Sequence, residues 1–73
     1  MKRKIVTVDS IRASITTIRQ MAVLRDYEVA HNAEIELHQA VLRAIAKGQC
    51  EDPIACARAA LRSLDIEFIR VTS

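Results

Sequence analysis

Apolar residues in the first part of the chain recur at helical intervals. One stripe consists of Ile11, Ile15, Ile18, Ala22 and Val29. This spacing predicts an amphipathic helix over residues 10–30, which Asp9 or Ser10 can cap at its start. Met21 and Leu24 lie off the stripe, so the helix is apolar on two sides. Such a helix is expected to pack both within its own chain and against a second copy.

The phase of the apolar stripe changes near His31–Asn32, which predicts a break there and a second helix over residues 33–47. Asn32 can cap this helix, and Gly48 is of the type that ends one. Its expected buried face consists of Ile35, Leu37, Val41, Leu42, Ala44 and Ile45. The alternative is one unbroken helix over residues 10–47, because no glycine or proline precedes Gly48. That helix would favour an extended antiparallel dimer.

A short connector that holds the only glycine and the only proline, Gly48 and Pro53, precedes a third helix. Asp52 followed by Pro53 is typical of an N-cap and a first helical position, where the missing N–H of proline costs nothing. A stripe with steps of four, three, four and three residues follows, formed by Ala57, Leu61, Leu64, Phe68 and Val71. It predicts a helix over residues 53–70. The predicted fold is therefore mainly α, a three-helix bundle with a short N-terminal extended segment, in one domain over residues 1–73.

An α+β fold is the alternative. Residues 4–8 and 66–71 are rich in β-branched or aromatic side chains, which suit short strands. Paired with each other, the two strands would bracket the helices. A ribbon of only these two strands would leave apolar side chains on both of its faces, which favours the helical interpretation of the C-terminal segment.

The core of one protomer is expected to be small. A chain of 73 residues buries only about 60% of the surface that its unfolded form exposes. Its apolar residues are mostly aliphatic, and Tyr27 and Phe68 are its only aromatic residues. Two cysteines, Cys50 and Cys56, without the spacing of a zinc site predict neither a disulfide framework nor a structural metal. Self-association is then the natural way to cover apolar surface, and we expect a homodimer.

The residues expected to mediate self-association lie on the first helix. They are Ile11, Ile15, Ile18, Met21 and Leu24. The basic start of the chain is followed by an apolar run, Ile5 to Val8, that is too short for a signal peptide or a membrane span. We therefore expect a cytoplasmic protein with reduced thiols and no membrane association.

His31, Glu34 and His38 are the residues with most potential for chemistry. On a single helix they would share one sector, and two imidazoles with a carboxylate can ligate a metal. A break at Asn32 removes His31 from that face and leaves Glu34 and His38 as an i,i+4 pair. We expect no metal or other cofactor, and His38 to be a boundary histidine with one nitrogen hydrogen-bonded. No serine has a recognisable partner set for nucleophilic catalysis, so an enzyme is not predicted.

The net charge of +2 is too small to name a class of partner, although arginine supplies eight of the eleven basic residues. Ala44, Gly48 and Ile54 have the spacing of a helix-turn-helix. Arg58 and Arg62 share an exposed face of the third helix that can touch a DNA backbone. Two carboxylates in the lengthened turn would repel phosphates. DNA binding by a degenerate helix-turn-helix is therefore the alternative function.

The run from Leu37 to Val41, then Gly48, then Ser63 to Asp65 resembles the helix, glycine and helix spacing of the small enterobacterial biofilm-connector proteins, over less than half of the chain. The resemblance implies a dimeric helical regulator, but it is one of spacing alone and assigns no family. The function we predict is a small cytosolic protein-interaction module, a regulator, inhibitor or adaptor, that acts as a homodimer and without catalysis. Its expected partner is another protein.

Overall fold

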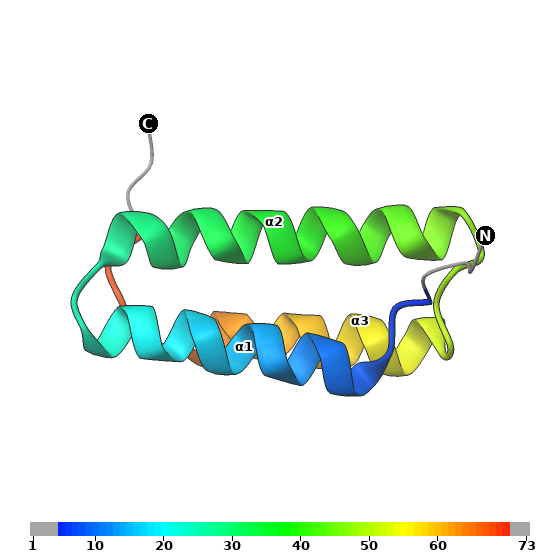
Figure 1. Cartoon of the computed structure of the whole chain (residues 1–73), viewed down its shortest axis with the longest axis horizontal. Helices are drawn as coiled ribbons and strands as arrows, with labels where there is room; N and C mark the ends of the chain where they lie inside the picture. The colour runs from blue at the N-terminus through cyan, green and yellow to red at the C-terminus, as the bar shows by residue number, and fades with distance from the viewer. Residues whose placement is uncertain (1–4, 71–73) are drawn as a thin grey trace.

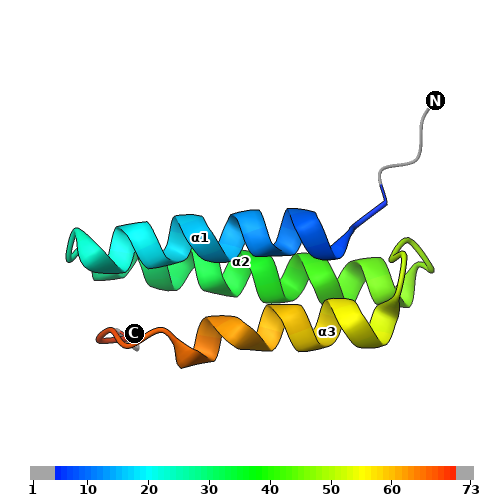
Figure 2. The same ribbon diagram turned by 90° about the horizontal axis from the view of Figure 1, so that it is seen from below.

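Three helices lie side by side as a bundle (Figures 1 and 2). In the computed structural model, which describes residues 5–70, they are α1 (Val8–Val23), α2 (Tyr27–Ala46) and α3 (Pro53–Leu61), and a short 3₁₀ turn, η1 (Arg62–Asp65), follows α3. Because α2 runs opposite to both of its neighbours, α1 and α3 point the same way (Figure 2). The predicted three-helix bundle is confirmed.

A capping box starts α1 slightly earlier than predicted. The backbone N–H of Ser10 donates to Thr7 Oγ1 at 3.1 Å, and the backbone N–H of Thr7 donates to Ser10 Oγ at 3.2 Å. These two bonds satisfy donors that a helix start leaves without partners. Thr7, and not Asp9 or Ser10, is therefore the N-cap.

A Schellman-type turn ends α1 at Val23. The N–H of Asp26 donates to Met21 O at 2.9 Å, and the N–H of Arg25 donates to Ala22 O at 3.0 Å. Arg25 takes a left-handed conformation with φ of 61°, which glycine adopts far more readily than arginine does. This type of turn usually contains a glycine, but here it is formed without one.

This turn corrects the predicted division of residues 10–47. The break at His31–Asn32 and a first helix reaching residue 30 are wrong, and so is the single unbroken helix. The buried positions of α2 are Ala30, Glu34, Leu37, Val41 and Ala44. Glu34, a charged residue, belongs to this buried stripe, whereas Val29 is 45% exposed. The sequence pattern assigned these two residues to the opposite sides, and so misplaced the change of phase.

The third helix is also shorter than the predicted 53–70. Helix α3 ends at Leu61, and after η1 the chain has no regular structure as far as Arg70. Ile66 turns into the core, where it is 7% exposed. Arg70 then reaches back to Glu34 on α2 at 2.8 Å. A straight helix would carry both side chains away from these positions.

Most of the predicted apolar stripe of the third helix does not face the core, and of its described members only Phe68 packs against the core. The buried residues of α3 and η1 are Cys56, Ala59, Ala60 and Ser63. Leu61 and Leu64, from the predicted stripe, are 57% and 55% exposed. Val71, its last member, lies outside the described residues. Small side chains thus fill the space between the helices, and the large ones of α3 point outward.

The alternative α+β fold is wrong for the residues that the structure describes. Val6 pairs with the connector and not with residues 66–70: its N–H donates to Gln49 O at 2.9 Å, and its carbonyl accepts from the N–H of Glu51 at 3.1 Å. The only bridge so formed is an isolated parallel one with Cys50. Residues 66–70 lie at the other end of the bundle (Figure 1). The outer ends of the proposed strands, residues 4 and 71, are outside the described range.

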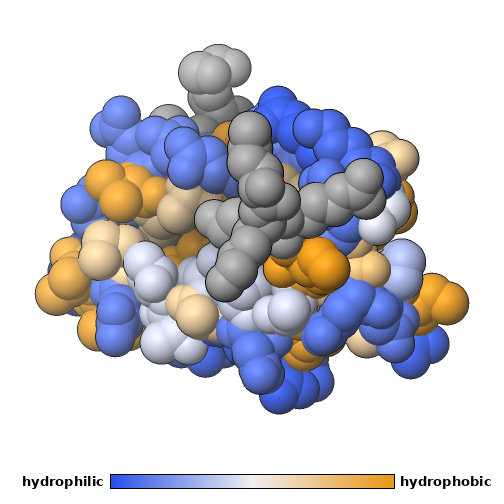
Figure 3. Space-filling model, turned by 45° about the vertical axis from the view of Figure 1, so that its right-hand side comes forward, coloured by the Kyte–Doolittle hydropathy of each residue, from blue (hydrophilic) through white to orange (hydrophobic). Residues whose placement is uncertain are grey.

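Apolar side chains are divided between a narrow core and the surface. The core combines Ile11, Ile15, Ile18 and Ala22 of α1 with Ala30, Leu37 and Val41 of α2, Cys56, Ala59 and Ala60 of α3, and Ile66. Ten large aliphatic residues remain exposed among residues 5–70. Figure 3 shows one side of the molecule, where such residues emerge in separate groups between hydrophilic ones. None of the described helices has the length and apolar character needed to cross a bilayer.

Candidate functional site

The residues predicted to mediate self-association lie mostly inside the protomer. Ile11 and Ile18 are 1% exposed, and Ile15 is 6% exposed. Met21 is half-buried against the same core, while Leu24 is 70% exposed in the turn after α1. Three of the five therefore already pack within their own chain and offer no apolar surface to a second copy. The sequence pattern thus assigned three core residues of the protomer to an interface.

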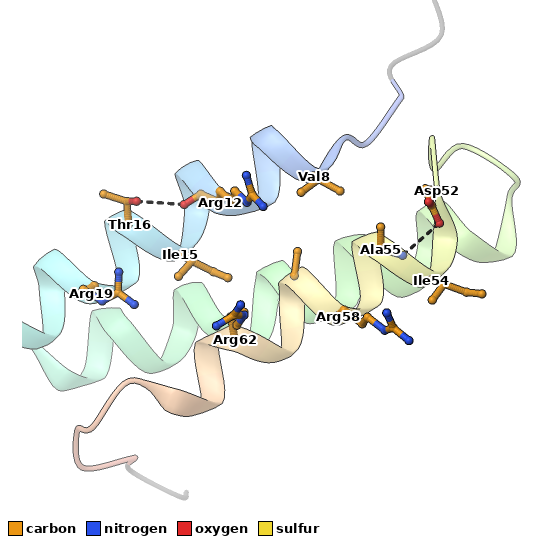
Figure 4. A pocket seen from close by; sticks show the side chains of 11 residues that line it. Val8, Arg12, Ile15, Thr16, Arg19, Asp52, Ile54, Ala55, Arg58 and Arg62 are labelled. Atoms are coloured by element: carbon orange, nitrogen blue, oxygen red, sulfur yellow. Dashed lines mark hydrogen bonds between the residues drawn. The ribbon is translucent and has the colours of Figure 1, made fainter.

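The predicted nucleic-acid contacts fall on an arginine-lined groove between α1 and α3. Arg58 and Arg62 are both exposed, one helical turn apart. Arg12 and Arg19, two turns apart on α1, line the same groove from the other side (Figure 4). The sequence pattern found the first pair, but only the packing of α1 beside α3 brings in the second.

The groove is an open hollow of about 670 Å³ with both apolar and cationic walls. Its lining consists of Val8, Arg12, Ile15, Thr16 and Arg19 from α1, and Asp52, Ile54, Ala55, Arg58, Ala59 and Arg62 from the α3 side. Ile15 and Ala59 are buried and form its floor. The arginines lie around this floor, so a bound group can meet apolar surface and positive charge at once.

Both helices present their positive N-terminal ends at the same end of the groove, because α1 and α3 run in parallel. Asp52 is the one acidic residue in the lining. Its Oδ1 accepts the backbone N–H of Ala55 at 3.1 Å, which is the N-cap bond of α3. This carboxylate is thus already engaged by the helix that it starts.

The four arginines carry an unneutralised charge. Within residues 5–70 the single ion pair is that of Glu34 with Arg70, so no carboxylate of the described chain pairs with an arginine of the groove. A guanidinium presents a planar fork of donors that matches carboxylates and phosphates in a bidentate manner. The groove is therefore suited to an anionic group with some apolar surface.

A second polar cluster ties the C-terminal segment to α2. Arg70 Nε and Nη2 donate to the two oxygens of Glu34 at 2.8 and 3.1 Å, and Nη2 also donates to the carbonyls of Ser63 and Ile66. The guanidinium lies 4.1 Å from the ring centroid of Phe68. Burial acts to raise the pKa of Glu34, but hydrogen bonds from Arg70 and Ser63 and the charge of Arg70 outweigh it and lower that pKa.

A serine and a histidine meet beside this cluster, which the sequence analysis did not foresee. His38 Nε2 lies 2.8 Å from Ser63 Oγ and 3.3 Å from Ala60 O. The expectation that His38 is a boundary histidine with one hydrogen-bonded nitrogen is confirmed. Ser63 is fully buried, and its hydroxyl also interacts with Glu34. A substrate cannot reach that hydroxyl in this conformation, so we interpret the contact as a structural tie between α2 and η1.

The remaining candidate ligands are scattered. No three histidine, cysteine or acidic side chains among residues 5–70 are grouped so that they could hold a metal ion. His31 is half-buried, and its Nδ1 has no partner there. Cys56 is buried, whereas Cys50 is half-buried in the connector. Burial, with the neighbouring Cys56 thiol, raises the pKa of Cys50 to about 11, so its thiolate is scarce at neutral pH.

Comparison with known proteins adds no relative to this description. No family model matches the chain, and no curated protein or solved structure matches it. Function is therefore inferred from the residues of this chain alone.

Proposed function

We propose that the protein is a non-catalytic protein-interaction module, a regulator, inhibitor or adaptor, and that its arginine-lined groove receives an acidic segment of another protein. The observation that carries this proposal is the set of four guanidinium groups without a carboxylate partner in the described chain, gathered on one groove by two helices. Arginine clusters are a recurring way to recognise acidic motifs.

An acidic amphipathic helix fits the groove better than a nucleic acid does. Five of the eleven lining residues are Val, Ile or Ala, and a sugar–phosphate backbone has no apolar side chain to place against them. The carboxylates of Asp9, Glu51 and Asp52, at the end where α1 and α3 begin, repel phosphates and glutamates alike, so the apolar lining is what separates the two ligands. A helix of three turns, about 16 Å long, matches the distance that the lining of α1 spans from Val8 to Arg19.

Direct binding tests the proposal. The probe is a fluorescein-labelled helical peptide of about 14 residues, with leucines on one face and glutamates on both flanks. We expect saturable binding that weakens as salt rises, because exposed charges are screened. The variant Arg12→Gln with Arg58→Gln should bind at least about tenfold more weakly, a loss of roughly 1.4 kcal/mol. Arg43→Gln with Lys47→Gln, which removes two exposed positive charges outside the groove, is the matched control and should bind as the wild type does.

Two results would overturn the assignment of the groove. One is the absence of binding by the wild type at low salt. The other is an equal loss in the groove variant and in the control with Arg43→Gln and Lys47→Gln, which would mean that only net charge matters. A peptide with glutamine in place of glutamate separates charge recognition from apolar contact.

DNA binding is the second candidate, because Arg58 and Arg62 lie on the same cationic groove as Arg12 and Arg19. A duplex of about 20 base pairs, measured beside the acidic peptide at equal salt, distinguishes the two. If the duplex binds more tightly, and Arg58→Ala with Arg62→Ala abolishes that binding, the protein is a nucleic-acid binder and the acidic-segment proposal fails.

A further inference from the structure

Helix α3 is apolar on almost every side but is covered on only one. In its sequence from Pro53 to Leu61, Arg58 is the only residue with a polar side chain other than a thiol. A helix that is apolar all round is normally buried all round. Here Cys56 and Ala60 with Ala59 form the covered side, and they bring small side chains to the core.

The large side chains of α3 and η1 form a stripe on the outside. Ile54, Ala57, Leu61 and Leu64 follow one another at steps of three, four and three residues, the spacing of a two-helix seam. Ile54 is 68% exposed, and Leu61 and Leu64 are exposed by more than half. This stripe has the pattern of a core, yet its three large side chains are left exposed by the described chain.

Two residues of α2 widen the stripe into an apolar face. Ile35 and Leu42 lie three residues before and four residues after His38, so both adjoin it on the surface of α2. His38 itself contacts Ala60 and Ser63 on the α3 side. Ile35 and Leu42 are 40% and 66% exposed, although the sequence pattern placed them in the core. We call the five exposed residues, Ile35, Leu42, Ile54, Leu61 and Leu64, the outer face.

We infer that a second copy of this chain covers the outer face, with α3 packed antiparallel to its counterpart. The order of side-chain sizes is self-complementary. In an antiparallel pairing centred on the stripe, Ile54 meets Leu64 of the other copy, and the small Ala57 meets the large Leu61. A two-fold interface needs this kind of match between one surface and itself.

The area of the outer face suits a dimer of moderate strength. Five aliphatic side chains, each at least 40% exposed, offer roughly 300 Å² on one copy, which is the size at which the largest apolar patch of a monomer often has a function. Two copies and the flanking atoms, among them Ala57 and the alkyl part of Arg58, approach the roughly 1,000 Å² at which specific interfaces begin. Dissociation in the micromolar range is the expected consequence.

The dimer would also bear on the arginine-lined groove. Ile54 belongs both to the groove lining and to the outer face, so the groove and the interface share an edge. Two copies would thus hold two grooves on either side of one seam. This inference does not depend on what the groove binds.

Sedimentation velocity over roughly 5 to 200 µM, a range that brackets the expected dissociation constant, tests the inference. We expect the wild type to change from monomer to dimer as concentration rises. The variant Leu61→Glu with Leu64→Glu should remain monomeric throughout, because it places carboxylates in an apolar seam. Both residues are exposed in the protomer, so the variant should keep its far-ultraviolet circular dichroism spectrum, which is measured in parallel.

Leu24→Glu is the matched control. Leu24 is another exposed leucine, 70% exposed in the turn after α1 and not part of the outer face, and its variant should dimerise as the wild type does. The inference is overturned if the wild type stays monomeric at the highest concentration. It is also overturned if the doubly substituted variant still dimerises, or if Leu24→Glu alone abolishes the dimer. Binding of the acidic peptide by the monomeric variant shows separately whether the groove works in one copy.

Discussion

Replacing Arg70 by methionine should destabilise the protein strongly. Glu34 is 4% exposed, and its two oxygens accept from Arg70 at 2.8 and 3.1 Å. Removing one partner of a fully buried ion pair costs about 3–5 kcal/mol. The side chain of Arg70 is 28% exposed, so we reduce this to about 2 kcal/mol to allow for screening by water. For a domain of this size that loss lowers Tm by about 8–16 °C.

Thermal unfolding followed by circular dichroism measures this loss. The matched control is Arg43→Met, which removes an exposed arginine with no ion-pair partner in the described chain, and should change stability by less than about 1 kcal/mol. Glu34→Met combined with Arg70→Met should be more stable than Arg70→Met alone, because no buried charge is left unpaired. Equal Tm values for Arg70→Met and Arg43→Met would refute the conclusion that the ion pair of Arg70 with Glu34 stabilises the fold.

The pH dependence gives an independent signature. In the wild type the pKa of Glu34 lies below its ordinary value of 4.5, so its stabilising contribution is complete above about pH 4.5 and is lost as the pH falls through the lowered pKa. In Arg70→Met the burial of Glu34 is no longer outweighed, which raises its pKa. The variant then favours the protonated carboxyl, and its deficit in Tm should shrink between pH 7 and pH 4. A constant deficit over that range would contradict the explanation.

Three further substitutions, two of them paired with a control, test local features. Arg25→Gly should stabilise the protein by about 0.5–1 kcal/mol, since glycine adopts the left-handed conformation, with φ of 61°, without the strain that arginine has there. Its control, Arg43→Gly in the last turn of α2, should destabilise the protein by about as much, because glycine is a poor helix former. Thr7→Ala should cost about 1 kcal/mol in chemical denaturation because the capping box of α1 is lost. Ile18→Ala should lower the free energy of unfolding by about 2–5 kcal/mol, whereas Leu24→Ala should change it by no more than about 0.5 kcal/mol. A larger loss for Leu24→Ala than for Ile18→Ala would contradict the assignment of Ile18 to the core.

The number and type of the helices could be predicted from the sequence because helical periodicity is a local property. The start of α3 was equally readable, since Asp52 and Pro53 carry a capping signal. The turn after α1 was not, because Arg25 takes the place where glycine would have marked it. Glu34 added to the error, because its burial depends on Arg70, a contact that no local pattern contains.

Only two of the four arginines of the candidate site could be predicted from the sequence. Arg58 and Arg62 were found because they share one face of a helix. Arg12 and Arg19 became part of the site only through the packing of α1 beside α3. The apolar stripe of the third helix was also recognised, but its spacing says only that Leu61 and its neighbours share a side, and does not say whether that side faces inward or outward.

The hydrogen bonds of Val6 and Arg70, near the two limits of the described residues, have a consequence for the order in which the fold forms. Helices α1 and α2 meet across a short turn, while Val6 bonds to Gln49 and Arg70 bonds to Glu34, residues at least 36 positions apart. Contacts between near neighbours form fastest, and distant ones wait for the loss of entropy in closing a long loop. The α1–α2 hairpin should therefore form first, and the contacts of Val6 and Arg70 should form last and open first.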